Sequence, residues 1–191
     1  MKNQILKFVM GVMILPLGVM AQDHSHHDMN HDEKSMNHKD GQVKHFEVSG
    51  DFQKQLNAVY QAGLALNTAF VKGDVDAVKS KSAAMSATMK NVDMSLLKGD
   101  KHMAWMEYMK TINEGLKAIS ASDDIAEQRK LYADVSDGLY KSVKAFGVGE
   151  TVYFQYCPMA KSGWLNNSDE VKNPYYGSMM LTCGSTKEVL N

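Results

Sequence analysis

The chain has 191 residues and a formal net charge of −1, with 21 basic and 22 acidic side chains. This length suits one domain with a real core, and the interspersed charges form no basic stripe for phosphate, which argues against nucleic acid as a partner. Fifteen methionines are far above ordinary use, and methionine serves either as adaptable core filler or as a soft thioether ligand.

Residues 1–21 have the features of a secretory signal peptide. Lys2 and Lys7 precede the apolar run FVMGVMILPLGV, and the compact residues Val19 and Ala21 stand before a sudden polar stretch. The apolar run is shorter than the roughly 20 residues that a transmembrane helix needs. We therefore expect export with cleavage after Ala21, and no membrane insertion of the mature protein.

Residues 22–49 are predicted to form a disordered tail rich in histidine and methionine, because they contain too little aliphatic surface to offset the entropy of ordering. Histidines at this density bind first-row metal ions without a preformed pocket. We expect loosely bound copper, zinc or other divalent ions here; the alternative is a polar spacer. The tail ligands that we predict are His24, His26, His27, His31 and His38.

The next segment has apolar residues at spacings of three and four, which predicts four helices separated by turn signals. We expect these helices at about 51–72, 75–91, 101–120 and 124–146. Four amphipathic helices of similar length with short links favour an antiparallel four-helix bundle. The predicted fold class is therefore all-α, with one helical bundle domain over residues 50–191.

Residues 147–191 differ in character and predict a small cap of loops and a β-ribbon on the bundle. The stretch GVGETVYFQYCPMA has the β-branched and aromatic content of a strand, and GSMMLTCG is expected to form a second strand. A turn-rich loop, KSGWLNNSDEVKNPYYG, is expected between them. Both cysteines of the chain, Cys157 and Cys183, lie in this cap.

The two cysteines allow two interpretations. In an exported protein they favour a structural disulfide, worth roughly 3 kcal/mol through loop closure. Alternatively, Met159 follows Cys157 and Met180 precedes Cys183 at short spacing, and thiolates with thioethers are the ligand set that selects Cu(I). A regular antiparallel ribbon would separate the cysteines, whereas a parallel return or a turn at CPMA would bring them together.

His102 stands outside the tail, on the third predicted helix, and Met106 follows at the i+4 position on the same face. A lone histidine on a helix is more often a core or boundary residue, and methionines at helical spacing also suit a buried stripe. Against that alternative, we predict His102 and Met106 as auxiliary metal ligands.

The usual catalytic motifs are missing from the sequence. It contains no GxSxG, no phosphate loop, no HExxH and no CxxC, so we do not expect an enzyme. A thiol-disulfide or copper-reducing activity of the cysteine pair has the least support, since exchange chemistry usually requires closely spaced cysteines and a lowered thiol pKa.

Six stretches carry a family resemblance, in the order HMAWM, DIAEQRKLYADVS, YCPMA, GWLN, NPYYG and MLTCG. They resemble exported bacterial domains of unknown function that occur alone or appended to periplasmic adaptor subunits of copper and heavy-metal efflux pumps. The resemblance implies a helical domain whose CPMA and MLTCG elements form one site, with copper as the ligand. It points to Cys157, Met159, Met180, Cys183 and His102.

The chain differs from the adaptors in that it shows no adaptor hairpin or barrel, and it carries the histidine-rich segment in their place. We therefore expect a Cu(I) buffer or carrier in the periplasm of a Gram-negative bacterium, linked to copper tolerance or efflux, with a periplasmic efflux adaptor as its partner. The alternative is a disulfide-clamped helical module that docks on an envelope efflux partner, with metal incidental.

Overall fold

The computed structural model describes residues 43–191, so the predicted signal peptide and the tail histidines lie outside the described residues. Its elements in chain order are α1 (Gly50–Lys72), α2 (Val75–Lys90), η1 (Met94–Leu96), α3 (Asp100–Ala121), α4 (Ile125–Phe146), β1 (Val152–Cys157), β2 (Ser162–Asn166), η2 (Gly177–Met179) and β3 (Ser185–Leu190). The four predicted helices are confirmed, with bounds close to those expected from the sequence.

Local side-chain caps set the starts of three helices. The Ser49 hydroxyl accepts a hydrogen bond from the Phe52 N–H at 3.3 Å, and Asp74 and Asp124 cap α2 and α4 in the same way. Such caps satisfy N–H groups that the first turn leaves without a partner. Helix α1 ends at Gly73, whose φ of 70° is a left-handed conformation that glycine adopts without strain.

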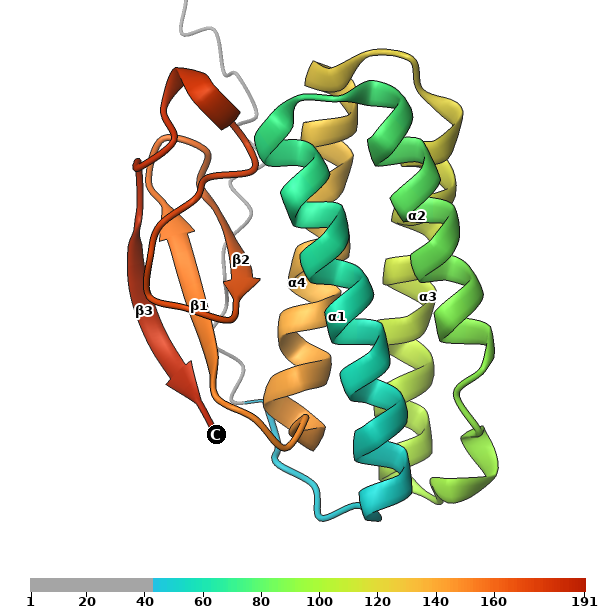
Figure 1. Cartoon of the computed structure of the whole chain (residues 1–191). Helices are drawn as coiled ribbons and strands as arrows, with labels where there is room; N and C mark the ends of the chain where they lie inside the picture. Colours follow the sequence, from blue (N-terminus) through green and yellow to red (C-terminus); the bar gives the residue numbers. More distant parts are fainter. Residues whose placement is uncertain (1–42) are drawn as a thin grey trace, which may run out of the picture. The chain divides into compact units, whose positions relative to one another are not determined.

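The helices pack around one apolar core, with consecutive helices running in opposite directions (Figure 1). Phe52 of α1 makes edge contacts with Trp105 of α3 at 5.6 Å and with Phe146 of α4 at 5.3 Å between ring centroids. Met85 and Met89 of α2 complete this core. Within residues 43–191, no helix is long and apolar enough to span a membrane.

The folded unit begins earlier than predicted, because residues 43–49 belong to it. Phe46 is 8% exposed and its ring stacks on Phe146, with 5.4 Å between centroids. The Phe46 N–H donates to the carbonyl of Ala145 at 2.7 Å. Val43 and Val48 also pack against the core, so the segment is ordered by Phe46 together with these two valines.

The cap is a three-stranded antiparallel sheet with the order β2-β1-β3 (Figure 1). The predicted strand at β1 is confirmed, but the prediction of a second strand at GSMMLTCG is wrong. That stretch forms η2 and turns, while β2 lies inside the predicted loop and β3 follows the last cysteine. The fold is therefore mostly helical with a small sheet, rather than all-α.

Glycine explains why GSMMLTCG does not extend. Gly177 has a φ of 54°, and a Cβ there would lie 2.6 Å from Nη2 of Arg129 and 2.8 Å from the carbonyl oxygen of Val71. This left-handed conformation against the end of α1 interrupts an extended strand and is available mainly to glycine. The stretch is therefore held against the bundle as a turn.

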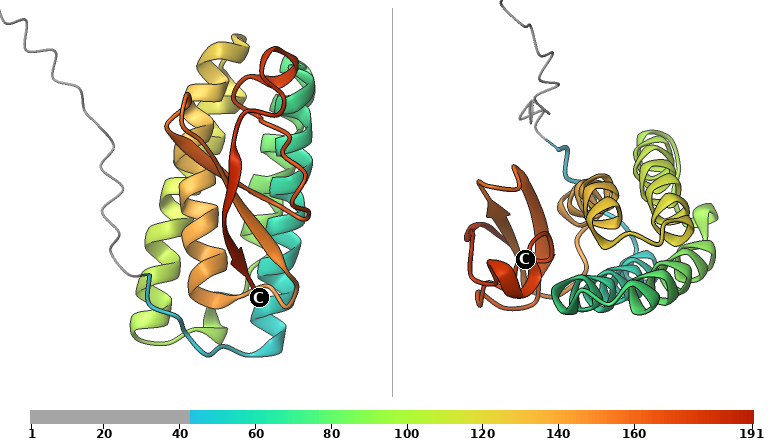
Figure 2. Two further views of the ribbon diagram at one scale, coloured as in Figure 1. Left: turned by 90° about the vertical axis from the view of Figure 1, so that its left-hand side faces the viewer. Right: turned by 90° about the horizontal axis from the view of Figure 1, so that it is seen from above.

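The sheet packs on the bundle mainly through α4, as the side and end views in Figure 2 show. The Ser136 hydroxyl of α4 donates to the carbonyl of Gly163 in β2 at 2.8 Å. Tyr140 of α4 stacks on Phe154 of β1, with 4.0 Å between ring centroids, and its hydroxyl donates to Glu188 of β3 at 2.6 Å. These contacts fix the sheet, and hence the cysteines, relative to the helices.

Candidate functional site

The sheet brings the two cysteines together. Cys157 is the last residue of β1 and Cys183 lies two residues before β3, where Tyr156 pairs with Ser185. Their Sγ atoms are 3.2 Å apart; Cys157 is fully buried, Cys183 is half-buried, and both are free thiols. Of the geometries considered from the sequence, the turn at CPMA is confirmed and the ribbon that separates the cysteines is wrong.

The separation of the sulfurs suits two chemical states. A disulfide has a bond of about 2.05 Å, while two sulfurs that bind one tetrahedral metal ion at about 2.3 Å lie about 3.8 Å apart. The observed 3.2 Å lies between these values. A small movement therefore allows the same pair either to close a disulfide or to bind one metal ion.

A tight turn surrounds the Cys157 sulfur with donors. Residues 158–161 join β1 to β2, and Pro158 at the start of this turn has no N–H of its own. Burial by itself raises the pKa of the Cys157 thiol, but hydrogen bonds from the Ala160 backbone, Cys183, Asn173 and the Met159 backbone outweigh it. The pKa of Cys157 therefore lies below its usual value, and this thiol is the more readily deprotonated of the pair.

The pKa of Cys183 is shifted in the opposite direction. Its hydrogen bond to Cys157 raises the pKa of its thiol, and burial and the charge of Cys157 act in the same direction. The next residue, Gly184, has a φ of 139°, and a Cβ there would lie 3.0 Å from the carbonyl oxygen of Tyr156. The absence of a side chain at Gly184 lets the two cysteine segments approach each other closely.

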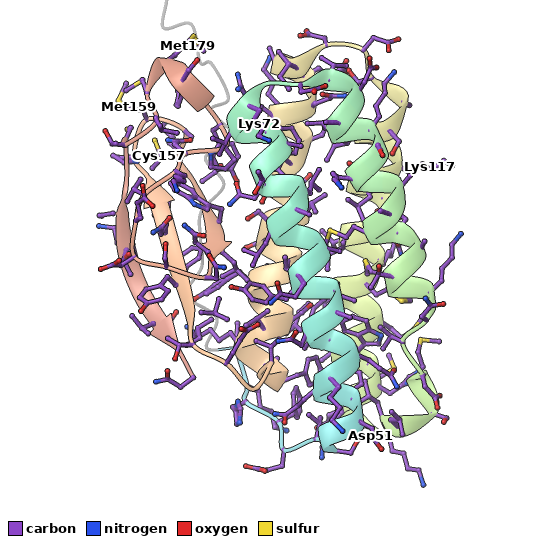
Figure 3. The ribbon with its side chains drawn as sticks, in the orientation of Figure 1. Asp51, Lys72, Lys117, Cys157, Met159 and Met179 are labelled. Carbon is purple, nitrogen blue, oxygen red and sulfur yellow. The ribbon has the colours of Figure 1, made fainter. Side chains whose placement is uncertain are left out.

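Three methionines of the cap are exposed to solvent. Met159 is 63% exposed, Met179 is 73% exposed and Met180 is 37% exposed. Figure 3 shows Met159 and Met179 at the same end of the cap as Cys157. Exposed thioethers contribute little to the core, so they are free to serve as soft ligands next to the thiols.

His102 and Met106 lie elsewhere. They belong to the start of α3, which contacts the start of α1 through Trp105 and Phe52, whereas η2 lies against the end of α1 near Phe70. Figure 3 likewise shows Asp51 and Cys157 at opposite ends. At 1.5 Å per residue, about 18 residues of α1 separate these regions by roughly 27 Å. The structure does not place His102 and Met106 with the cysteines, contrary to the prediction that they are auxiliary ligands.

In the part of the chain that the structure describes, no three His, Cys, Asp or Glu side chains come together at one point. A metal ion at the cysteine pair would therefore take further protein ligands from the methionines of the cap. The predicted tail ligands, from His24 to His38, lie in the segment that is not described.

Two residues near the site, Asn173 in the NPYYG stretch and Arg129 in α4, were not singled out individually from the sequence. Asn173 is buried beside the cysteines, and Arg129 of α4 donates to the carbonyls of Pro174, at 3.1 Å, and Phe70, at 3.0 Å. These contacts tie the loop to the ends of two helices. Both residues lie in stretches that carry the family resemblance, which was the one available signal for them.

Comparison with known proteins identifies one similarity. Residues 59–151 match a family model whose description is "protein of unknown function (DUF3347)". The match runs from within α1 to the residue before β1, so it includes most of the helical bundle but neither cysteine. No curated protein and no solved structure matches the chain.

Proposed function

We propose that this protein binds Cu(I) through Cys157 and Cys183, with Met159 and Met180 as thioether ligands. The observation that supports the proposal is the pair of free thiols 3.2 Å apart, with exposed methionines at the same end of the cap. Thiolate and thioether sulfurs favour a soft monovalent ion.

Zinc fits this site less well than Cu(I). Structural zinc sites usually take four ligands from cysteine, histidine and carboxylates, whereas within residues 43–191 no third residue of these types joins the cysteines. Cu(I) accepts the ligand set that is present. The half-buried Cys183 and the exposed thioethers also provide a path by which the ion can enter and leave.

The biological setting that we propose is the periplasm of a Gram-negative bacterium. The signal-like residues 1–21 and the resemblance to domains of copper-efflux adaptors support export and a link to copper tolerance. The protein would act as a Cu(I) buffer or carrier for an efflux adaptor, and the histidines of residues 22–49 would hold further copper or zinc ions loosely.

The proposal is tested by titrating the purified protein with Cu(I) under anaerobic, reducing conditions against a chromogenic competitor. We expect one tight site, and a loss of affinity in Cys157→Ser and Cys183→Ser that exceeds the roughly 100-fold effect of outer-shell changes. Met103→Leu, which alters an exposed methionine of α3, is the control. Cysteine variants that bind Cu(I) as tightly as the parent would show that the assignment is wrong.

A second candidate function is a disulfide-clamped helical module that docks on an envelope partner. The same 3.2 Å separation favours it, because the sulfurs need to move only about 1.2 Å to reach a bond of about 2.05 Å. Counting free thiols in protein isolated anaerobically from the cell envelope separates the two candidates. A complete disulfide supports the module, whereas two free thiols support copper binding.

A further inference from the structure

Asn173 is fully buried and lies at the centre of the loops that carry the two cysteines. Its Nδ2 donates to the carbonyl of Cys183 at 2.7 Å, and the Asn173 side chain is among the groups that lower the pKa of the Cys157 thiol. A carboxamide nitrogen carries two N–H groups. In this structure one of them anchors the backbone of Cys183.

The other half of the side chain shapes its own loop. Asn173 Oδ1 accepts hydrogen bonds from the backbone N–H groups of Tyr175, at 2.8 Å, and Tyr176, at 3.3 Å. The Asn173 backbone N–H donates to Leu181 at 2.8 Å, and its carbonyl accepts from Gly177 at 3.0 Å. The oxygen and the backbone therefore hold the turn, while the nitrogen is left for the cysteines.

A side chain that is not a ligand but hydrogen-bonds to a ligand residue is typical of the outer shell of a metal site. Groups that hydrogen-bond to metal ligands orient them and tune their basicity, and their loss typically weakens metal affinity 10- to 100-fold. A loop held only for its own stability would need the contacts of the oxygen, not a donor directed at the residue that carries the second thiol. The amide fixes the backbone of Cys183, whose Sγ lies 3.2 Å from that of Cys157.

We propose that Asn173 is a positioning residue that holds Cys157 and Cys183 in the arrangement that binds Cu(I). This inference rests on the proposed function and adds to it a residue that is not itself a ligand. Asn173 anchors the backbone of Cys183 beside Cys157, so the paired sulfurs need little rearrangement on binding.

The test uses Asn173→Asp, which has nearly the same shape. The carboxylate still accepts from the Tyr175 and Tyr176 N–H groups, but it replaces both donors with a negative charge that repels the sulfurs. Asn166→Asp is the matched control in the same cap, because Asn166 Nδ2 donates to the Glu170 carbonyl at 2.9 Å, away from the cysteines. We expect Asn173→Asp to weaken Cu(I) binding 10- to 100-fold and to change the sulfur-to-copper absorption band, with Asn166→Asp unchanged.

A second measurement needs no copper. Equilibration with glutathione redox buffers gives the midpoint potential of the cysteine pair. We expect Asn173→Asp to shift it to more negative values, since the added charge destabilises the reduced thiolate, and Asn166→Asp to keep the parent value. Asn173→Ser, which is neutral and has a hydroxyl that accepts from the turn, replaces the aspartate variant if that variant does not fold; we expect about tenfold weaker Cu(I) binding.

The outcomes separate the two proposals. If the parent protein does not bind Cu(I) tightly, the proposed function fails, and the role of Asn173 is then decided by the midpoint potential. If the parent binds Cu(I) but the folded Asn173 variants bind equally well, the positioning role is wrong. Equal losses in the variants of Asn173 and Asn166 would also overturn it, because they would mean general loosening of the cap.

Discussion

The methionines of helix α2 and those of the cap differ sharply in their exposure to solvent. Met85 and Met89 are 0% and 1% exposed within the helical core, whereas Met159 and Met179 are 63% and 73% exposed at the end of the cap that carries Cys157. The methionines that the structure describes therefore include both buried and exposed side chains. The buried methionines fill the core, and only the exposed methionines are accessible to a metal ion.

The largest expected effect is on the stability of the bundle. Met85→Ala and Met89→Ala each leave a cavity in a fully packed core and should lower the free energy of unfolding by about 2 to 5 kcal/mol, measured by urea denaturation. Met179→Ala removes an exposed side chain and should change it by less than about 0.5 kcal/mol. An equal loss of unfolding free energy in Met179→Ala and in the two α2 variants would contradict the difference in burial between these methionines.

The packing of the cap on the bundle can be tested by measuring how the free energy of unfolding depends on pH. Tyr132 of α4 and Tyr175 of the cap are buried, with 5.6 Å between ring centroids, and burial raises the pKa of both well above the usual value. The unfolded chain ionises these groups from about pH 10, so their stabilising contribution is complete below that pH. It is lost at about 1.4 kcal/mol per pH unit for each tyrosine as the pH rises toward the folded pKa.

Urea denaturation between pH 8 and pH 11.5 measures this dependence. Tyr132→Phe removes one ionising group from the interface and should make the alkaline loss of stability shallower than in the parent. An identical slope in the two proteins would show that Tyr132 ionises freely and that the cap is not tightly packed on α4 there.

The exposed methionines should affect copper rather than stability. We expect Met159→Leu and Met180→Leu each to weaken Cu(I) binding about tenfold, or about 1.4 kcal/mol, because leucine keeps the size of the side chain and removes the sulfur. Met103 of α3 is 69% exposed, so Met103→Leu provides a control of similar exposure in the bundle. A similar loss of Cu(I) affinity in Met103→Leu would mean that the effect is not specific to the methionines of the cap.

The smallest expected effect concerns the predicted auxiliary ligands on α3. His102→Ala and Met106→Leu should leave Cu(I) affinity at the cysteine pair within about twofold of the parent, because roughly 27 Å of α1 separates the two regions. Competition titration at the tight site measures this. A tenfold loss of Cu(I) affinity in either variant would show that the residue contributes to the copper site after all.

Much of the helical part could be predicted from the sequence. Spacings of three and four and the KGD turns place all four helices, because helix periodicity and end signals are local properties of the chain. The candidate ligands Cys157, Met159, Met180 and Cys183 were also evident, since each thiol has a thioether within three residues. These are features that a short window of residues determines by itself.

Only the tertiary structure decided which of these groups meet. The sequence placed a strand at GSMMLTCG, but Gly177 turns against the end of α1, and β3 supplies the pairing that brings Cys183 to within 3.2 Å of Cys157. It also grouped His102 with the sulfurs, although a full helix length lies between them. Strand register and helix length act between residues far apart in the chain, so local patterns do not contain them.

The role of Asn173 follows from the same distinction. Its stretch, NPYYG, was visible as part of a resemblance, but nothing local indicates that its amide binds the backbone of Cys183. The sequence by itself determined the helices and the soft character of the candidate ligands. The packing of the cap decided that the sulfurs form a pair and which buried donor supports them, because a polar group in the interior must find its partner wherever the fold places it.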